Sequence, residues 1–219
     1  SVGIVRRLLI GTAVVEIAGA ICYSFWFVPH YGLWKGIGYS IFHSISAFCN
    51  AGIDILGSDS LAKYICNPLI NITTMLLIIL SGIGFSVWYD VLGNIKKIRK
   101  KEIPGKWWFT RLRLHSKLAI VTTLILLAVG TLLTFLLEYH NPDTIGHLSF
   151  GEKWMASAFQ SVTTRTAGYS TFSQAGMHEE TRFLNILLMF IGGSPGGTAG
   201  GVKTTTIAML MLTCIAFVR

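Results

Sequence analysis

The sequence predicts an all-α membrane protein in which a unit of three helical segments occurs twice. Hydrophobic residues make up 52% of the 219 residues and charged residues only 13%, a composition that argues against a soluble domain. Three apolar spans are long enough to cross a bilayer as helices. The sequence FHSIS at 42–46 also matches FQSVT at 159–163 position by position, which indicates an internal repeat.

The first unit begins with an apolar span at 8–28 that carries one charge, Glu16. This carboxylate is either functional within the membrane or bonded to a neighbouring helix. Pro29 is expected to end the helix, because proline cannot donate to the backbone ladder. The apolar stretch 34–48 is too short to cross, so it is expected to enter the membrane and turn back. One long helix is then expected to return over residues 67–98.

Nine of the 18 Lys and Arg residues lie between Lys96 and Lys117, together with one acid, Glu102. This basic stretch follows one apolar span and precedes the next, as cytoplasmic loops do under the positive-inside rule. Arg6 and Arg7 before the first span place that end on the same side. Membrane topology therefore explains the net charge of +8, and nucleic-acid binding is not expected.

The second unit repeats this order of segments. An apolar span at 118–137 is followed by a short helix at 150–164, whose start is marked by the capping box SFGE at 149–152. The other end of this short helix points toward the membrane centre, where the helix dipole favours a cation. From residue 183 onward the chain is apolar but interrupted at 192–206. The predicted division is repeat, basic cytoplasmic loop and repeat, at 1–98, 99–117 and 118–219.

Each short helix is followed by a loop that contains an Ala-Gly pair, NAGID at 50–54 and TAGYS at 166–170. The second loop resembles the potassium-channel filter sequence TVGYG, with one of its two glycines. In such filters backbone carbonyl oxygens replace the hydration shell of the ion, and glycine permits the backbone angles this needs. The two loops therefore predict a cation path built from backbone atoms.

Six glycines in ten residues mark the interruption, at Gly192, Gly193, Gly196, Gly197, Gly200 and Gly201. A phosphate-binding loop is the competing interpretation, because 196–204 nearly reads GxxxxGK[ST]. Val202 is inserted before Lys203, however, and no strand pattern precedes the loop. A helix interrupted inside the membrane, which transporters use at ion sites and gates, fits better. Lys203 is expected to anchor the loop toward the cytoplasm, with contact to ions as the alternative.

Four segments together resemble the Trk/Ktr/HKT superfamily of potassium transporters: SAFCNAGID, QSVTTRTAGYST, SGIGFSVWYD and GGSPGGTAGGVKTTT. The resemblance is strongest to the membrane subunit of bacterial Ktr uptake systems and extends over essentially the whole chain. It implies four helix–pore loop–helix (M1-P-M2) repeats in one chain, with pseudo-fourfold symmetry around a potassium-channel-like pore. The two repeats here resemble the second and third. We therefore expect a fragment, with half of a symmetric assembly as the alternative.

The resemblance also assigns roles to individual residues. It implies that potassium ions, and no transition metal, bind carbonyl groups at Asn50, Ala51, Gly52, Thr166, Ala167 and Gly168. The glycine-rich stretch is implied to obstruct the pore beneath this filter. Because the Arg165 guanidinium keeps its charge, it is expected to support its loop from behind, with a direct effect on ions as the alternative. His43 is expected to pack behind the other loop.

The predicted function is passive or ion-coupled potassium uptake across a bacterial inner membrane, without covalent chemistry. The resemblance implies a homodimer above a cytosolic ring of nucleotide-binding regulatory subunits; sodium coupling stays open and no cofactor is expected. A conventional potassium channel subunit, the main alternative, would need two glycines in each loop. A membrane-bound phosphate-loop enzyme would need an intact GKT. The cysteines show neither CxxC nor zinc-ligand spacing, so no metal cluster or disulfide framework is expected from Cys22, Cys49, Cys66 and Cys214.

Overall fold

The computed structural model describes residues 2–57, 59–101 and 104–218. Within these residues every regular element is helical, apart from one isolated bridge between Ile191 and Val202, so the predicted all-α class is confirmed. Glu102 of the basic loop lies outside the described residues. The α-helices are α1 Val2–Tyr31, α2 Leu33–Phe48, α3 Pro68–Ile83, α4 Phe85–Arg99, α5 Leu114–Glu138, α6 Phe150–Thr163, α7 Glu179–Phe190 and α8 Thr204–Val218, and the 3-10 helices are Ala62–Tyr64 and Gly105–Trp107.

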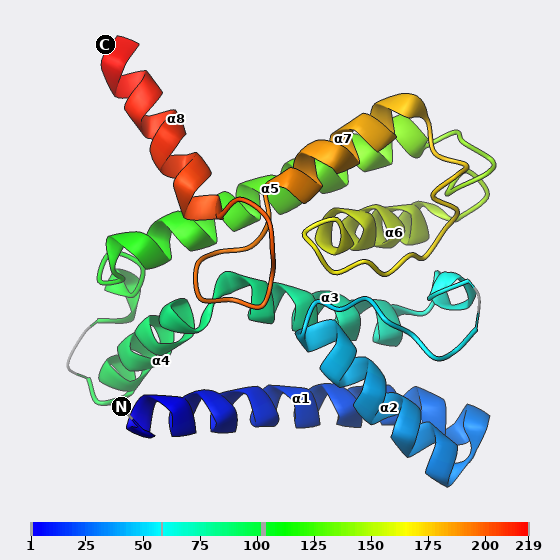
Figure 1. Cartoon of the computed structure of the whole chain (residues 1–219), viewed down its shortest axis with the longest axis horizontal. Helices are drawn as coiled ribbons and strands as arrows, with labels where there is room; N and C mark the ends of the chain where they lie inside the picture. The colour runs from blue at the N-terminus through cyan, green and yellow to red at the C-terminus, as the bar shows by residue number, and fades with distance from the viewer. Residues whose placement is uncertain (1, 58, 102–103, 219) are drawn as a thin grey trace.

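The helices of the two halves follow the same order of directions. In Figure 1, α1 and α5 run from left to right, and α3 and α7 run back. Helices α2 and α6, which occupy the ranges predicted for the short helices, start at the right-hand end and stop near the middle. By length and composition α1 and α5 can each cross a membrane, and the bent pair α3 and α4 gives a third crossing if it is counted as one span. The basic end of α4 and the start of α1 both lie at the left.

Helix α1 continues past Pro29, so the expectation that this proline ends the helix is wrong. The proline removes one bond of the backbone ladder, and the helix ends two residues later at Tyr31. The chain turns instead at Gly32, whose φ of 81° is favourable for glycine. Close packing then brings the start of α2 onto the end of α1, because a Cβ on Gly36 would lie 2.5 Å from the Cα of Val28.

Two helices, rather than the single one expected over 67–98, form the return of the first repeat. Helix α3 begins with Pro68 and is capped by Asn67, whose side chain accepts two backbone hydrogen bonds from the first turn. Helices α3 and α4 are bent by 96° relative to one another. Gly84 forms the bend with φ 95°, and a Cβ there would lie 2.5 Å from the Pro195 carbonyl oxygen. The break therefore lies where a distant segment packs against the chain.

Equivalent glycines pack the long helices of the two halves. In α1, a Cβ added to Gly19 would overlap the Ser44 hydroxyl of α2 and lie 2.9 Å from the Leu77 side chain of α3. The same close contacts recur in the second half at Gly130, Ser161 and Leu188. Small residues of this kind let helices approach closely inside a membrane, where apolar surface alone provides little drive for association.

The same two serines also join the short helices to the long ones. The Ser44 hydroxyl donates to the Glu16 carbonyl oxygen of α1 at 2.6 Å, and the Ser161 hydroxyl donates to the Leu127 carbonyl oxygen of α5 at 3.0 Å. Both serines belong to the FHSIS and FQSVT sequences that indicate the repeat. The two halves therefore share packing and hydrogen bonds as well as sequence.

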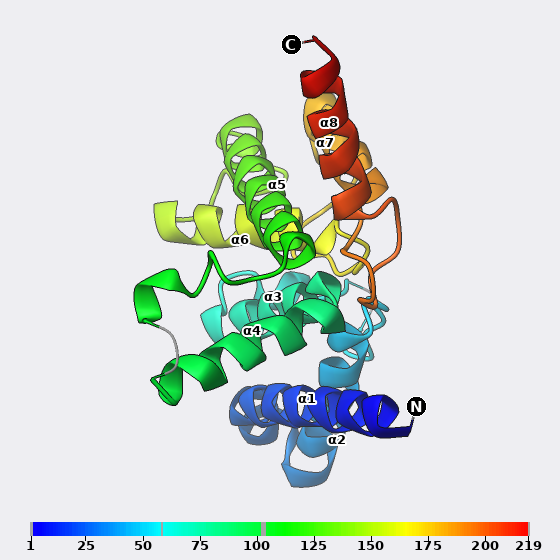
Figure 2. The same cartoon turned by 90° about the vertical axis from the view of Figure 1, so that its left-hand side faces the viewer.

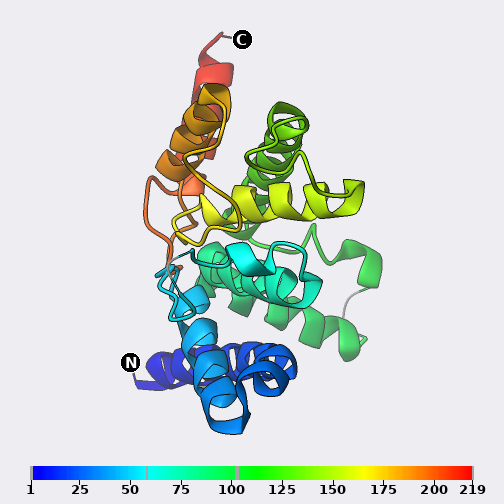
Figure 3. The same cartoon turned by 90° about the vertical axis from the view of Figure 1, so that its right-hand side faces the viewer.

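Residues 191–203 connect α7 to α8 without helix, and we call them the glycine-rich loop. Three threonines expected within the interruption, residues 204–206, form the first turn of α8 instead. The Thr204 amide donates to the Gly193 carbonyl oxygen at 3.1 Å, and its hydroxyl lies 2.7 Å from that of Ser194. These contacts close the loop, which extends from the α7–α8 junction toward α3 (Figures 1 and 3).

Large apolar side chains remain exposed along α1, α5, α7 and α8, among them Leu9, Phe25, Leu124 and Phe183. Continuous apolar faces of this extent are unfavourable in water and are typical of lipid or protein contacts. In Figure 2 the first half, with α1 and α2, lies below the second half, and α8 extends upward from it. Helix α8 therefore has little of its surface covered within the chain.

Candidate functional site

The two Ala-Gly loops lie against one another although 116 residues separate them. We call 50–54 the first loop and 166–170 the second loop. A Cβ added to Gly52 would overlap the Ala167 carbonyl oxygen and lie 2.8 Å from the Cα of Gly168. The Tyr169 hydroxyl also donates to the Ile53 carbonyl oxygen at 3.2 Å. The structure thus brings together backbone atoms of both loops at the positions that the sequence predicts for a filter.

Each loop is held to its short helix by an equivalent hydrogen bond. The Ser46 hydroxyl of α2 donates to the Ile53 carbonyl oxygen at 2.6 Å, and the Thr163 hydroxyl of α6 donates to the Tyr169 carbonyl oxygen at 2.7 Å. Ser46 and Thr163 close the matching FHSIS and FQSVT sequences, so the repeat could have identified them. Both loops are therefore positioned by a hydrogen bond from a hydroxyl near the end of the short helix to a backbone carbonyl oxygen of the loop.

The backbone of the two loops has left-handed residues at equivalent positions. Asn50 and Gly52 have φ values of 52° and 62°, and Thr166 and Gly168 have values of 74° and 96°. Glycine adopts such angles without strain, and asparagine tolerates them. A β-branched threonine there is a strained exception, and strain of this kind is found mainly at functional sites.

The glycine-rich loop is a folded-back segment that packs on the end of α3. Its two limbs are joined by a hydrogen bond of 3.3 Å from the Gly193 amide to the Gly200 carbonyl oxygen. The Ser194 amide donates to the Gly82 carbonyl oxygen of α3 at 2.8 Å. A Cβ on Gly197 would lie 2.6 Å from the carbonyl oxygen of Ser81 in the same helix. Glycine is therefore needed for packing at this contact, and not only for turning the chain.

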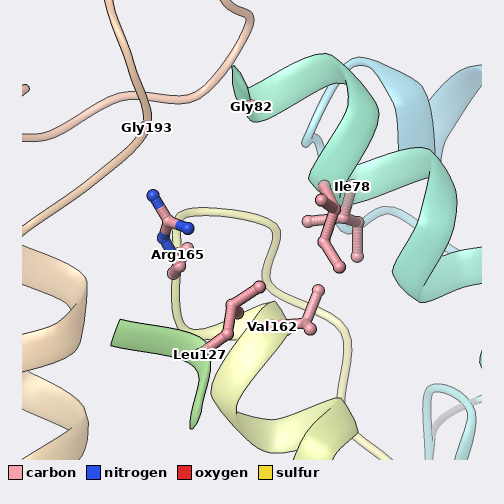
Figure 4. Close-up of a pocket in the computed structure, with 7 residues that line it drawn as sticks. Ile78, Gly82, Leu127, Val162, Arg165 and Gly193 are labelled. Carbon is pink, nitrogen blue, oxygen red and sulfur yellow. The ribbon is translucent and has the colours of Figure 1, made fainter. Parts of the chain in front are cut away.

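Arg165 joins the second loop to the glycine-rich loop. Its guanidinium is buried and donates from Nη2 to the Gly192 carbonyl oxygen at 3.0 Å, with a longer contact of 3.4 Å to the Thr123 hydroxyl of α5. In Figure 4 its nitrogens point toward the segment that carries Gly193. A cavity of about 10 Å³ beside it, lined in part by Val162, has room for about one water molecule.

The side chains of His43 and Lys203 each form a hydrogen bond with a backbone carbonyl oxygen four residues earlier in the chain. His43 is buried in α2 with Nδ1 2.7 Å from the Tyr39 carbonyl oxygen, and its ring packs against Phe27 of α1. Lys203 donates from Nζ to the Ala199 carbonyl oxygen at 2.8 Å. The lysine therefore closes the glycine-rich loop on itself in this arrangement.

Two carboxylates fix the segments that lead into α6. At its start, the Glu152 carboxylate accepts from the Ser149 hydroxyl and amide at 2.7 and 3.0 Å, and these bonds lower the pKa of Glu152. Glu138 at the end of α5 is fully buried and accepts from the Asn141 amide group and the His178 backbone amide at 2.6 and 2.9 Å. One of these donors to Glu138 is three positions away and the other 40, so no local pattern marks this carboxylate as buried.

Among the described residues no group of three or more His, Cys, Asp or Glu side chains could hold a metal ion, and the four cysteines are free. Where the two loops meet, the oxygen atom nearest to a Cβ added at Gly52 is the backbone carbonyl oxygen of Ala167. Carbonyl oxygens suit an alkali cation better than a transition metal.

The helical elements and their exposed apolar faces define an all-helical membrane protein, in which the two Ala-Gly loops lie together. The family model described as cation transport protein, TrkH, matches residues 2–219, and the chain belongs to this family. The solved structure of the potassium transporter TrkH from Vibrio parahaemolyticus is similar, with a TM-score of 0.73 over 97% of this chain and 41% of that one, at 21% identity. That likeness shows the common fold.

Curated relatives match more than nine-tenths of the chain at higher identity. Ktr system potassium uptake protein B of Bacillus subtilis is 39% identical over 218 residues, which are 100% of this chain and 46% of that protein. The protein of the same name in Vibrio alginolyticus is 36% identical, over 99% of this chain and 45% of its own. Potassium/sodium uptake protein NtpJ of Enterococcus hirae is 40% identical, over 91% and 41%. The chain spans about half the length of these relatives.

Proposed function

We propose that this chain supplies half of a pore through which potassium enters the cell. The observation that carries the proposal is the contact between the two Ala-Gly loops, with Gly52 and Gly168 left-handed and adjacent. Carbonyl groups of residues 50–52 and 166–168 would replace part of the hydration shell of a potassium ion. The names of the relatives, potassium uptake proteins, support potassium as the ion.

Two loops surround only part of an ion, so the complete pore needs two further repeats. We place these in the part of the relatives' length that this chain does not span. The units 1–98 and 118–219 are then adjacent repeats of a pseudo-fourfold ring, joined by the basic loop 99–117. The loop would face the cytoplasm of a bacterium, where a nucleotide-binding regulatory ring could bind a dimer of the full-length protein. The word system in the relatives' names is consistent with further components.

The glycine-rich loop would act as the gate of this pore. It is hydrogen-bonded to the second loop through Arg165 and packs on the end of α3, beside the first loop's partner Ser81. A phosphate site is the weaker alternative, because the Lys203 ammonium and the Gly200 amide already bind atoms of the protein. A conventional potassium channel is disfavoured by the single glycine in each loop.

Deletion of residues 196–201 in the full-length protein tests the gate. We expect a higher potassium flux in proteoliposomes and a weaker dependence on any regulator, because the obstruction is removed. The control is Gly38→Ala in α2, where an added Cβ meets nothing within 4 Å and flux should stay at the wild-type level. Unchanged flux and intact regulation after the deletion would show that this loop is not a gate.

A further inference from the structure

Four non-glycine residues in the described parts of the chain have positive φ, and two of them occupy equivalent positions in the two loops. These two are Asn50, with φ 52°, and Thr166, with φ 74°. Each comes two residues before the loop glycine, where a carbonyl group is expected to face the ion. Left-handed backbone at such residues persists only when surrounding contacts hold it. The contacts around Asn50 and Thr166 therefore determine whether the two loops keep this backbone conformation.

Asn50 is held by its side chain. The buried amide group donates to the Thr198 hydroxyl at 2.8 Å and to the Ser81 hydroxyl of α3 at 3.0 Å. The Thr198 hydroxyl in turn donates to the Phe48 carbonyl oxygen at 3.0 Å, at the end of α2. Thr198 belongs to the glycine-rich loop, so this loop contacts both the end of α2 and the first residue of the first loop.

Thr166 is also held by the glycine-rich loop, through Gly200, which lies two residues after Thr198. Its hydroxyl accepts a hydrogen bond of 2.9 Å from the Gly200 amide. The neighbouring Arg165 binds the carbonyl oxygen of Gly192 on the other limb. Both strained residues of the paired loops are thus bonded to one short segment, residues 198–200.

We infer that the glycine-rich loop holds the two filter loops in their potassium-selective geometry, with Thr198 and Thr166 as positioning residues. The inference rests on the proposed function, since it assumes that these loops discriminate ions. Displacement of residues 198–200 breaks the contacts to Asn50 and Thr166 together and frees both carbonyl groups to rotate. Potassium preference is therefore lower when the gate is displaced than when it is closed.

The test removes single hydroxyl groups in the full-length protein. Thr198→Val and Thr166→Val delete the hydrogen bonds and keep the β-branched shape, whereas Thr198→Ser and Thr166→Ser keep the hydroxyl. Each valine variant should reduce the preference for potassium over sodium about fivefold, which corresponds to about 1 kcal/mol, while the serine variants keep it. The measurement is potassium uptake with sodium titrated as competitor. Thr213→Val, whose hydroxyl binds only its own helix α8, is the matched control.

A role confined to gating gives a different result. The valine variants would then raise maximal flux and leave the potassium preference unchanged, which overturns the inference. If Gly52→Ser lowers the preference in the same assay, the filter itself stands and only its dependence on the loop is refuted. If Gly52→Ser also leaves the preference unchanged, the proposed function fails.

A second variant covers the case in which Thr198→Val does not reach the membrane. Ser81→Ala removes the other acceptor of the Asn50 amide, a hydroxyl on α3, and leaves in place the Ser81 carbonyl oxygen that accepts from the Thr198 amide. It should lower the potassium preference by about twofold to fivefold. As an independent readout, potassium should raise the melting temperature of the purified valine and alanine variants less than that of the wild type. Equal stabilisation of all variants by potassium contradicts the inference.

Discussion

At the residue scale, Gly52 and Gly168 differ in what surrounds them. Both have positive φ, so any side chain brings roughly 1–3 kcal/mol of strain. A Cβ on Gly52 would in addition overlap the Ala167 carbonyl oxygen of the other loop, whereas a Cβ on Gly168 has its nearest contact at 3.6 Å. Gly52→Ser should therefore disturb both loops, and Gly168→Ser mainly its own.

We expect Gly52→Ser and Gly168→Ser to weaken potassium affinity and to let sodium compete, with the larger loss for Gly52→Ser. A loss of about 1.4 kcal/mol in relative binding corresponds to a tenfold loss of preference. The measurement is potassium uptake by a cell that needs external potassium, with and without sodium. Gly32→Ser is the control, because Gly32 also has a positive φ, 81°, but lies between α1 and α2. Wild-type half-saturation and sodium sensitivity in both filter variants would refute the assignment.

The sequence identifies Gly52 and Gly168 as filter candidates, because an Ala-Gly pair follows each of the two matching short helices. It does not predict that Asn50 and Thr166 are left-handed, since neither residue type requires that conformation. The bond from Asn50 to Thr198 joins residues 148 positions apart and has no local signal. Arg165 is expected from its fixed charge to support its loop from behind, but its partner, the Gly192 carbonyl oxygen 27 positions away, has no local signal.

At the element scale, the close helix contacts at Gly19 and Gly130 set how tightly each half packs. Gly19→Ala should destabilise the protein by about 1–3 kcal/mol, because the new methyl group must displace the Ser44 hydroxyl and the Leu77 side chain. Gly11→Ala in the same helix is the control. Its Cβ meets only the Trp88 ring at 3.8 Å, so helix propensity should leave it neutral or up to about 1 kcal/mol more stable.

Thermal unfolding of the purified full-length protein measures this difference. Equal melting temperatures for Gly19→Ala and Gly11→Ala would show that the helices can separate without cost at this contact. Gly130→Ala should behave like Gly19→Ala, because Ser161 and Leu188 surround it in the same way.

Element boundaries are less predictable than the elements themselves. The short helices α2 and α6 follow from apolar stretches of limited length, and α6 also from its capping residues. The 96° bend at Gly84 is not predicted, because glycines within an apolar stretch are compatible with a continuous helix. The Phe85 amide donates to the Gly196 carbonyl oxygen at 3.1 Å, so the bend depends on a contact with a segment far along the chain. At Pro29 the error is in the other direction: the proline predicts a helix end, but α1 continues past it to Tyr31.

At the scale of the whole molecule, the distribution of charge and of exposed apolar surface determines how the chain can lie in a membrane. The basic end of α4 and the acidic start of α7 lie at opposite ends of the long helices in Figure 1. In the chain between these two segments, α5 runs from the left-hand end to the right-hand end, whereas α6 starts at the right-hand end and stops near the middle. Lys106 and Glu180, both exposed, should therefore lie on opposite sides of the membrane.

Single-cysteine labelling tests this arrangement in the full-length protein, in a background without the native cysteines. A membrane-impermeant maleimide should label Glu180→Cys in intact cells and Lys106→Cys only after permeabilisation. Leu132→Cys, on the exposed apolar face of α5, should resist the reagent in both conditions, because lipid covers it. If α6 crossed the membrane instead of returning, Lys106→Cys and Glu180→Cys would be labelled from the same side. That outcome would separate the two loops and remove the geometric basis of the filter.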